Sequence, residues 1–374
     1  MKKIFLLILF LFLTFFVACN SSTNQVETIE ISTVEDLLLL ENEVSANYIL
    51  TNDIDCGGKK FNSIDGFCGK IDGQGYVIRN VEFIDEKNHF GLIGTASSFF
   101  DGKDRDSVVI KNLGIEDFVI NADYECGDLS LAVGAFIASS DYSVKFENCY
   151  STGEINISQK GNDTNVGGLV GYVYSVARVT NCYSNVDIKC INPNGGGGYT
   201  CFGGLVGRCF KAFIETCYCS GDIIYKNDSS WITDLYGADI FMGAACGLPE
   251  TMSKLVNFIN LSGEMSCNVK SEYLNPLYGG TYAKGEILDN YYCAYASDSD
   301  YESTKYSFTL SDSLSAVSLA KNIMASKDFL TGKCSSLNEF GEEIGIPCNF
   351  SEEIWNMYAY EEGSIKYPTL KVFD

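Results

Sequence analysis

Short runs of β-branched and aromatic residues, separated by glycine and asparagine, make up most of the chain from about residue 46 onward. Proline is rare, and no helical period of 3.6 residues runs through this region. Such runs are typical of many short β-strands. The segment STVEDLLLLENEV (residues 32–44) differs, because Ser32 and Glu35 have the spacing of a capping box ahead of a leucine run. It predicts a short helix that caps the strands.

A glycine-rich element recurs among these runs. Its copies read VGAFIAS, VGGLVGY, FGGLVGR and MGAACGL, with FGLIG (90–94) as an earlier, shorter form. A repeat of this kind indicates stacked units, because one unit alone cannot bury its apolar side chains and neighbouring units bury them together. The aligned glycines are Gly134, Gly167, Gly203 and Gly243, at spacings of 33, 36 and 40 residues.

A second element repeats in step with the first and reads IKNLGI, FENCYS, VTNCYS, IETCYC, LVNFIN and LDNYYC. Positions one and four are apolar and position two is mostly polar. The strict alternation of inward and outward side chains along a strand is therefore broken between positions one and four. A bend at position three explains this change, because asparagine tolerates left-handed geometry and can hydrogen-bond to neighbours above and below. Position three is Asn112, Asn148, Asn181, Thr216, Asn257 and Asn290.

These patterns predict an all-β fold: a right-handed parallel β-helix, or solenoid, of about eight coils with short helical caps. Near the C-terminus the composition shifts to helix formers, with an apolar stripe at Leu314, Val317, Ala320 and Met324. We expect this helix to cover the strand edges of the last coil. The predicted segments are a signal peptide (1–18), a tether (19–29), an N-terminal helical cap (30–45), the solenoid (46–309) and a C-terminal cap (310–374).

The N-terminus has the features of an export signal. Lys2 and Lys3 precede an apolar run that ends at Ala18 and is shorter than the roughly 20 residues of a transmembrane helix. The run ends in FVAC, which resembles the lipobox of bacterial lipoproteins, although Phe16 stands where leucine is usual. We expect Cys19 to be lipidated and to anchor the chain in the cell envelope, at the outer membrane or cell surface. An uncleaved anchor or a plain signal peptide is the alternative.

The net charge of −23, from 26 Lys and Arg against 49 Asp and Glu, argues against nucleic acid as a partner, because phosphates require cationic surfaces. Anionic membrane surfaces are disfavoured for the same reason. Without Cys19, 15 of the 16 cysteines remain, so at least one thiol stays unpaired. Most could be buried as free thiols. The pairs close enough in sequence for a disulfide are Cys56 with Cys68, Cys190 with Cys201, and Cys334 with Cys348.

The pattern GGLVG followed by TNCYS resembles the GLUG motif of secreted and surface-attached bacterial proteins, some of which carry it beside immunoglobulin-A peptidase domains. Residues 48–83 look like the first coil of such proteins, and 364–373 are similar to their usual end. The resemblance covers roughly residues 30–374 and weakens at 242–248 and after Leu274. It implies the architecture and no activity, because the family shares no catalytic residues.

Few residues suit catalysis. His89 is the only histidine, so the zinc motif of metalloproteases is excluded, and we expect His89 to be a surface loop residue. Paired carboxylates could serve a polysaccharide-cleaving enzyme, but each pair lies in a predicted turn or loop, where acidic residues are common. We therefore assign no catalytic residue. The pairs are Asp53 with Asp55, Asp104 with Asp106, and Asp298 with Asp300.

Two columns outside the predicted core are candidates for binding. Position five of the asparagine element is expected to point outward and to form an aromatic stripe able to hold sugars or extended chains, unless the rings only shield the sheet. Four residues later, one carboxylate per coil could hold Ca²⁺ or could simply be solvated. The stripe is Tyr150, Tyr183, Tyr218 and Tyr292, and the carboxylates are Glu154, Asp187, Asp222 and Glu264.

The sequence thus favours a lipid-anchored envelope protein with an adhesin-like binding surface. Its expected partners are the membrane, through the N-terminal lipid, and host or environmental glycans or proteins. No cofactor is expected apart from the candidate Ca²⁺. A carbohydrate-active β-helix enzyme, such as a polysaccharide lyase or hydrolase, and a passive structural or antigenic surface protein are the alternatives.

Overall fold

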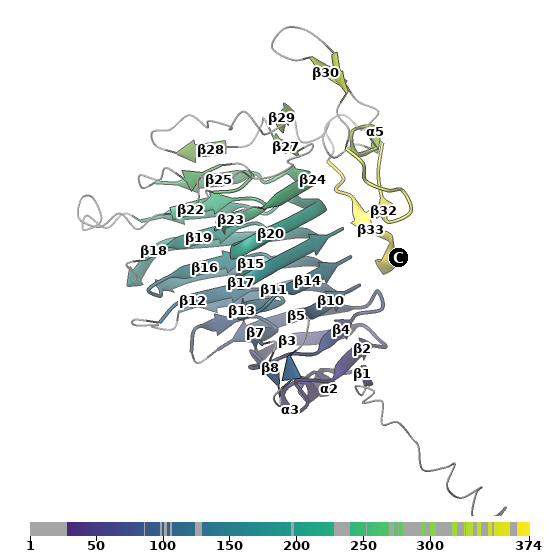
Figure 1. Ribbon diagram of the computed structural model, residues 1–374, viewed down its shortest axis with the longest axis vertical. Helices are drawn as coiled ribbons and strands as arrows, with labels where there is room; N and C mark the ends of the chain where they lie inside the picture. The colour runs from purple at the N-terminus through teal and green to yellow at the C-terminus, as the bar shows by residue number, and fades with distance from the viewer. Residues whose placement is uncertain are drawn as a thin grey trace, which may run out of the picture.

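The computed structural model shows an all-β protein whose strands stack layer upon layer along its longest axis (Figure 1). No helix among the described residues is long and apolar enough to cross a membrane. The structure describes residues 28–85, 87–97, 99–100, 103–104, 107–123, 129–195, 198–227, 240–251, 253–268, 273–275, 277–279, 293–296, 300–303, 316–319, 325, 327–331, 335–337, 343–345, 348–359 and 365–374.

The glycine elements form a six-stranded parallel sheet. The register confirms the alignment made from the sequence, because Gly134 pairs with Gly167, Gly167 with Gly203, and Gly203 with Gly243. Space requires glycine here: a Cβ on Gly167 would lie 2.1 Å from the carbonyl oxygen of Val170. In order, the strands are β26 (Tyr273–Leu274), β22 (Ile240–Gly243), β19 (Thr200–Gly203), β16 (Thr164–Gly167), β12 (Leu131–Gly134) and β6 (His89–Phe90).

A second sheet contains 21 strands, and its pairings are parallel as well. Strands that follow the glycine element are β7 (Ile93–Ala96), β13 (Ile137–Ser140), β17 (Val170–Thr180), β20 (Val206–Cys219) and β23 (Cys246–Pro249). The strands that lead into the bend are β2 (Asn47–Leu50), β4 (Lys70–Asp72), β10 (Val108–Lys111), β14 (Val144–Glu147) and β24 (Lys254–Asn260), and β1 (Thr28–Ile31) pairs beside them. The long strands β17 and β20 also extend into the bend.

The remaining strands of this sheet follow the bend or close the stack. They are β3 (Ile54–Asn62), β5 (Val77–Ile84), β11 (Gly114–Ala122), β15 (Tyr150–Lys160), β18 (Tyr183–Gly195), β21 (Ile223–Lys226), β25 (Glu264–Cys267), β27 (Cys293–Ala296), β28 (Asp300–Ser303) and β29 (Ala316–Leu319). In the described part of the chain, three antiparallel pairs lie outside both sheets: β8 (Phe99–Phe100) with β9 (Lys103–Asp104), β30 (Ser335–Leu337) with β31 (Glu343–Gly345), and β32 (Trp355–Asn356) with β33 (Thr369–Leu370).

The bend predicted at the asparagine column is confirmed. Its described members have a left-handed backbone, with φ between +49° and +54°. The side-chain amides also link neighbouring layers: Asn148 Nδ2 donates to Asn112 Oδ1 at 3.0 Å, and Asn181 Nδ2 donates to Asn148 Oδ1 at 3.2 Å. Asn112 Nδ2 continues the chain to Asp72 Oδ1 at 3.0 Å. Each bend therefore stabilises the next.

Equivalent positions of successive layers fill a single interior core. Ile110, Phe146, Val179 and Ile214 pair in order and are all buried. Cys149, Cys182 and Cys217 form a neighbouring buried column, in which the backbone N–H of Cys149 donates to Cys182 Sγ at 3.4 Å. Burial of this apolar surface, at about 25 cal/mol per Å², is the main force holding the layers together.

The N-terminal helical cap is present as α2 (Val34–Leu37) and α3 (Leu39–Asn42). Its capping box lies one residue later than predicted, because Thr33 receives the N–H of Asp36 and the Asp36 carboxylate receives the N–H of Thr33. β2 begins at Asn47, close to the predicted boundary, but β1 precedes the helices, where a tether and a cap were predicted, and pairs in parallel with β2.

The predicted C-terminal helix is wrong at Val317, which lies in β29 and pairs with Ala294 of β27. The open edge of β27 pairs with β29, although the sequence pattern favoured a helix in this segment. The helical turn described near this segment is α5 (Lys327–Leu330). Leu314, Ala320, Met324 and Cys334 lie outside the described residues.

Candidate functional site

Three of the four predicted stripe tyrosines stand in one column. Tyr150 pairs with Tyr183, and Tyr183 with Tyr218. The rings stack with centroids 4.7 Å and 4.8 Å apart and planes within 9° of parallel. Tyr292 lies outside the described residues, and the next pairing matches Ile259 with Ala294 instead of with Tyr292. The sequence alignment was therefore two residues out in this last repeat.

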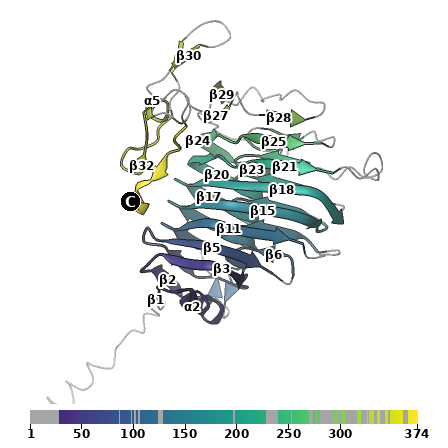
Figure 2. The same ribbon diagram turned by 180° about the vertical axis from the view of Figure 1, so that it is seen from behind.

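The tyrosine column is not an open surface, which corrects the expectation of an aromatic binding face. Tyr150, Tyr183 and Tyr218 are 5%, 8% and 2% exposed. A segment from the C-terminus covers them, here called the C-terminal strap (described residues 348–359 and 365–374). Figures 1 and 2 show the strap, in yellow, alongside the stack from opposite sides.

Aromatic contacts hold the strap to the column. Phe373 meets Tyr150 edge-on at 4.6 Å between ring centroids, and Trp355 lies 6.2 Å from Tyr183 and 6.0 Å from Tyr218. The Tyr218 hydroxyl donates to the carbonyl oxygen of Pro368 at 2.8 Å. Burial raises the pKa of Tyr183 and Tyr218 above the usual range of tyrosine, so both hydroxyls stay neutral. The column acts as an internal anchor for the C-terminus.

The carboxylate column is also in register. Glu154 pairs with Asp187, the N–H of Asp222 donates to Asp187 Oδ1 at 3.1 Å, and the N–H of Glu264 donates to Asp222 Oδ1 at 2.8 Å. Asp300, which the sequence analysis placed in another pair, follows Glu264 in the same column.

The protein itself engages three carboxylates of this column, those of Asp187, Asp222 and Glu264. Lys189 lies 3.5 Å from Asp187, and Lys226 lies 3.8 Å from Glu264. Backbone N–H groups and lysines thus offset the repulsion between stacked like charges. No group of three or more His, Cys, Asp or Glu residues able to hold a metal ion occurs in the part of the chain that the structure describes.

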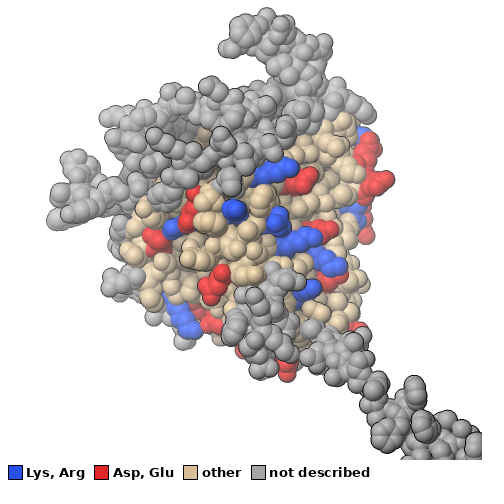
Figure 3. Space-filling view, viewed as in Figure 1, with Lys and Arg blue, Asp and Glu red and all other residues tan. Residues whose placement is uncertain are grey.

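A column of cations was missed by the sequence analysis. It lies one position before the asparagine element, where the pairing brings Lys145, Arg178, Phe213 and Lys254 into register on the outer face of β14, β17, β20 and β24. Figure 3 shows lysine and arginine side chains gathered over the middle of this face. Extending the aligned element by one residue upstream would have revealed the column, since the core position beside it was already aligned.

A hollow on the surface of the first layers is lined in part by Asp55, Glu82 and Asp117. Asp55 receives hydrogen bonds from Asn80 Nδ2 at 3.0 Å and from the N–H of Gly57 at 2.9 Å, and the bond from Asn80 is the main cause of its lowered pKa. Asp53 instead forms an ion pair with Arg79.

The remaining acidic and histidine predictions need correction. Asp55, Asp104 and Asp300 lie in β3, β9 and β28, whereas turns or loops were expected. Asp106 and Asp298 lie outside the described residues. His89 belongs to the two-residue strand β6 instead of a loop, and burial lowers its pKa. Asp55, Asp300 and His89 pair with residues of neighbouring layers, and β9 forms an antiparallel pair with β8, so strand pairing extends into segments that look like turns in isolation.

Of the two alternatives for the cysteines, disulfides between pairs close in sequence or buried free thiols, the structure has free thiols where the pairs can be checked. Cys56, Cys190 and Cys201 are buried free thiols, so neither Cys56 with Cys68 nor Cys190 with Cys201 is bridged. Cys334 and Cys19, the predicted lipidation residue, lie outside the described residues.

Comparison with known proteins agrees with this geometry. Residues 162–189 match the family model described as the GLUG motif. The chain carries a GLUG motif. The matched GLUG segment contains Gly167, Arg178, Asn181, Tyr183 and Asp187, so it contributes one member to every column described above. A search of the curated proteins finds no match.

Among solved structures, the GLUG-containing chain is similar to a candidate immunoglobulin A1 protease from Bacteroides ovatus, whose crystal structure was determined at 1.30 Å resolution. The alignment covers 85% of this chain and 92% of that chain, with a TM-score of 0.53 and 16% sequence identity. The TM-score indicates a shared fold, and identity this low leaves activity open.

Proposed function

We propose that the chain is a lipid-anchored β-solenoid of the cell envelope that acts as an adhesin-like binding module. Successive repeats pair in parallel through their glycine, asparagine and tyrosine columns. Such pairing supports a single stack of coils, about eight by the repeat count, in which each coil contacts only its neighbours. The export signal ending at Cys19 supports the envelope location.

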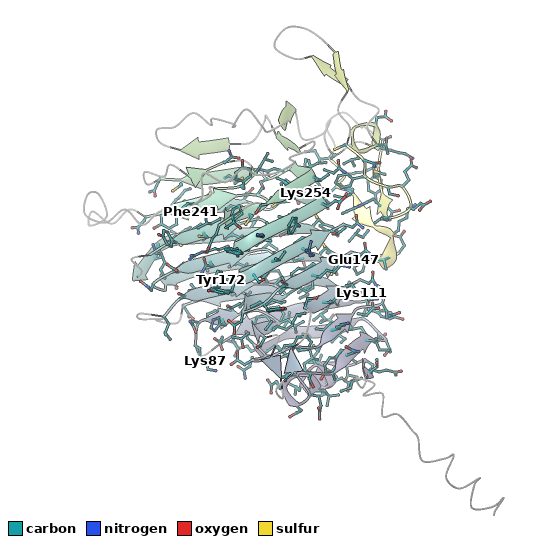
Figure 4. The ribbon with its side chains drawn as sticks, viewed as in Figure 1. Lys87, Lys111, Glu147, Tyr172, Phe241 and Lys254 are labelled. Carbon is teal, nitrogen blue, oxygen red and sulfur yellow. The ribbon has the colours of Figure 1, made fainter. Side chains whose placement is uncertain are left out.

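The observation that carries this proposal is the open sheet face built by β10, β14, β17, β20 and β24. Its outward side chains come from successive layers at strand spacing, about 4.8 Å. Figure 4 shows Lys111, Glu147 and Lys254 following one another up the same side of the stack. An extended, regular face of charged side chains suits recognition of an extended partner, since each layer offers one contact.

Protease shaving of intact cells of the source organism tests the location. The band that an antibody against residues 310–374 detects on a blot should disappear, while periplasmic control proteins stay intact. Cells that lack the gene should then adhere less to immobilised host or environmental glycans, and a Cys19→Ser chain should fail to restore adhesion. Survival of the band until the envelope is broken would overturn the adhesin-like function.

The hollow with Asp55, Glu82 and Asp117 favours a second function, cleavage of a polysaccharide by carboxylates. The hydrogen bond from Asn80 lowers the pKa of Asp55, so this group suits a base and not a proton donor. New reducing ends or unsaturated products from a panel of glycans, lost in the Asp55→Asn variant, would support an enzyme. No product from any glycan, together with no adhesion, would favour a passive structural role.

A further inference from the structure

One outward column of the open face carries cations and no carboxylate over six layers. Its members lie on β4, β10, β14, β17, β20 and β24, and each pairs with the next in the register. Five strand steps of about 4.8 Å give the column a length of roughly 24 Å. In order, the residues are Lys70, Val109, Lys145, Arg178, Phe213 and Lys254.

Arg178 is the centre of the column. Its guanidinium lies over the Phe213 ring, 4.7 Å from the ring centroid, and Arg178 is exposed. Stacking on an aromatic ring fixes the plane of the guanidinium and leaves its N–H edges available. A guanidinium held in this way is suited to bidentate hydrogen bonds with a carboxylate.

The upper half of the column has an excess of positive charge. A second outward column lies beside it, two residues further along each strand. In the lower half, Asp72 and Lys111 of this second column form an ion pair at 2.8 Å, and its Glu147 forms one with Lys145 at 2.7 Å. In the upper half its members are Thr180, Glu215 and Val256, so one carboxylate lies beside three cations, of which two belong to the column and one flanks it. Those cations are Arg178, Lys211 and Lys254, and within the described residues none of them forms an ion pair.

Lys211 widens this cationic surface toward an exposed ring. It lies two residues before Phe213 on β20, and alternation along a strand therefore places it on the same outward face. Its ammonium lies 5.8 Å from the centroid of the Phe210 ring, and Phe210 is 42% exposed. Cations and apolar rings thus adjoin on one surface, as recognition of an anionic sugar requires.

We infer that this surface, centred on Arg178 and Lys254, binds a linear polysaccharide that carries carboxylate groups. The inference rests on the proposed function and names its partner and site. The rings decide the class of partner: the aligned cations attract carboxylates, and Phe210 and Phe213 beside them suit the apolar faces of sugar rings, which a phosphate polymer lacks. A uronate polymer has at most one carboxylate per sugar and presents apolar ring faces as well.

Titration calorimetry of the full chain with polygalacturonate at 0.15 M NaCl tests the inference. Arg178→Gln/Lys254→Gln should weaken binding about tenfold or more, because each change removes a charge-assisted contact. Arg178→Lys, which keeps the charge and loses the fork, should weaken binding roughly threefold. The matched control is Lys59→Gln/Lys87→Gln, which makes the same change in net charge at side chains that are 64% and 65% exposed, outside the column. It should bind within about twofold of the unmodified chain.

Equal affinity of the column variant and the unmodified chain would overturn the inference, and so would an equal loss in the control. Tighter binding of inorganic polyphosphate or of phosphatidylserine vesicles than of polygalacturonate would overturn it too. Far-UV circular dichroism and melting curves establish that each variant is folded. If cells carrying the column variant still adhere as well as the unmodified strain, the site is wrong and the adhesin-like function stands. If neither strain adheres, the function itself fails.

Discussion

The asparagine column shows how one residue type can specify a repeating bend. Asn112, Asn148, Asn181 and Asn257 have φ between +49° and +52°, a region that asparagine enters at low cost. Their short amides also reach the next layer, so the same side chain sets the local backbone and joins two layers. Thr216 is the exception, with φ of +54° although its side chain is β-branched.

Thr216→Asn should therefore stabilise the protein. Removing a β-branched residue from the left-handed region should raise the free energy of unfolding by about 1 kcal/mol. The new amide would also lie next to Asn181 and could extend the ladder. Urea denaturation midpoints measure the change. The control is Thr180→Asn, one residue before the bend at Asn181, and it should not stabilise the protein. A lower midpoint for Thr216→Asn would contradict the strain argument.

The buried thiols make stability depend on pH. Burial raises the pKa of Cys190 to about 12, from 9.0 in the absence of the fold. As the pH rises above about 9, the unfolded chain releases this proton while the folded chain keeps it, so the free energy of unfolding falls. The contribution of Cys190 to this slope should be about 1.4 kcal/mol per pH unit.

Urea titrations between pH 8.5 and 10.5 in the presence of a reductant measure this slope. The Cys190→Ala chain should be less stable at pH 8, because a cavity forms, yet it should lose stability less steeply as the pH rises. Tyrosines titrate in both chains and cancel in the comparison. Parallel slopes for the two chains would show that Cys190 does not keep its proton in the folded state.

At the level of strands and segments, the C-terminal strap is attached differently from the layers. The layers are joined by continuous parallel ladders, whereas the strap meets the tyrosine column through rings and the bond from Tyr218 to Pro368. Trp355 is central to it and is 1% exposed, yet its indole N–H has no hydrogen-bond partner among the residues that the structure describes. Apolar contact is therefore the main force that holds the strap in place.

Trp355→Ala should release the strap and leave the stack folded. Replacing a buried tryptophan by alanine costs about 3–5 kcal/mol, and this loss falls on the strap alone. Hydrogen exchange should accelerate in peptides from 348–374 and around Tyr218, with no change in β12 and β13. Tyr358→Ala, at a strap residue that is 37% exposed, is the control and should exchange as the unmodified chain does. Unchanged exchange in Trp355→Ala would mean that other contacts hold the strap.

Across the whole molecule, charge is sorted by face. The carboxylate column runs up β15, β18, β21 and β25, while the cationic column runs up β14, β17, β20 and β24. Because the net charge is −23, self-repulsion opposes the compact state at low ionic strength. Local pairing offsets this repulsion only in part, since most of the ion pairs are at the surface.

The melting temperature should therefore rise by a few degrees between 0.01 M and 0.15 M NaCl, as the screening length falls from about 30 Å to about 8 Å. CaCl₂ at the same ionic strength should give the same rise, because lysines and backbone N–H groups already engage the carboxylates of the column. Differential scanning calorimetry measures both. An additional rise with CaCl₂ that disappears in Asp222→Asn would show that the column binds the cation.

Much of the layer architecture was readable in the sequence, because a stack of repeats turns sequence period into spatial register. Gly167 aligns with Gly203, Asn148 with Asn181 and Tyr150 with Tyr183 both in the sequence repeat and in the contacts between layers. The prediction failed where the period is lost, at the two-residue shift after Ile259 and at Val317 in a strand. In those places pairing with a neighbouring edge overrides local preference.

The sequence by itself determined the columns, since a residue that recurs at each period must meet its own copy in the next layer. Only the tertiary structure decided which columns face solvent. The contact between Tyr218 and Pro368 joins residues 150 positions apart and follows no period, so no repeat could predict that the strap buries the tyrosines. Lys145, Arg178 and Lys254 follow the same period, interrupted by Phe213, and only the structure shows that Arg178 and Lys254 are exposed on one face.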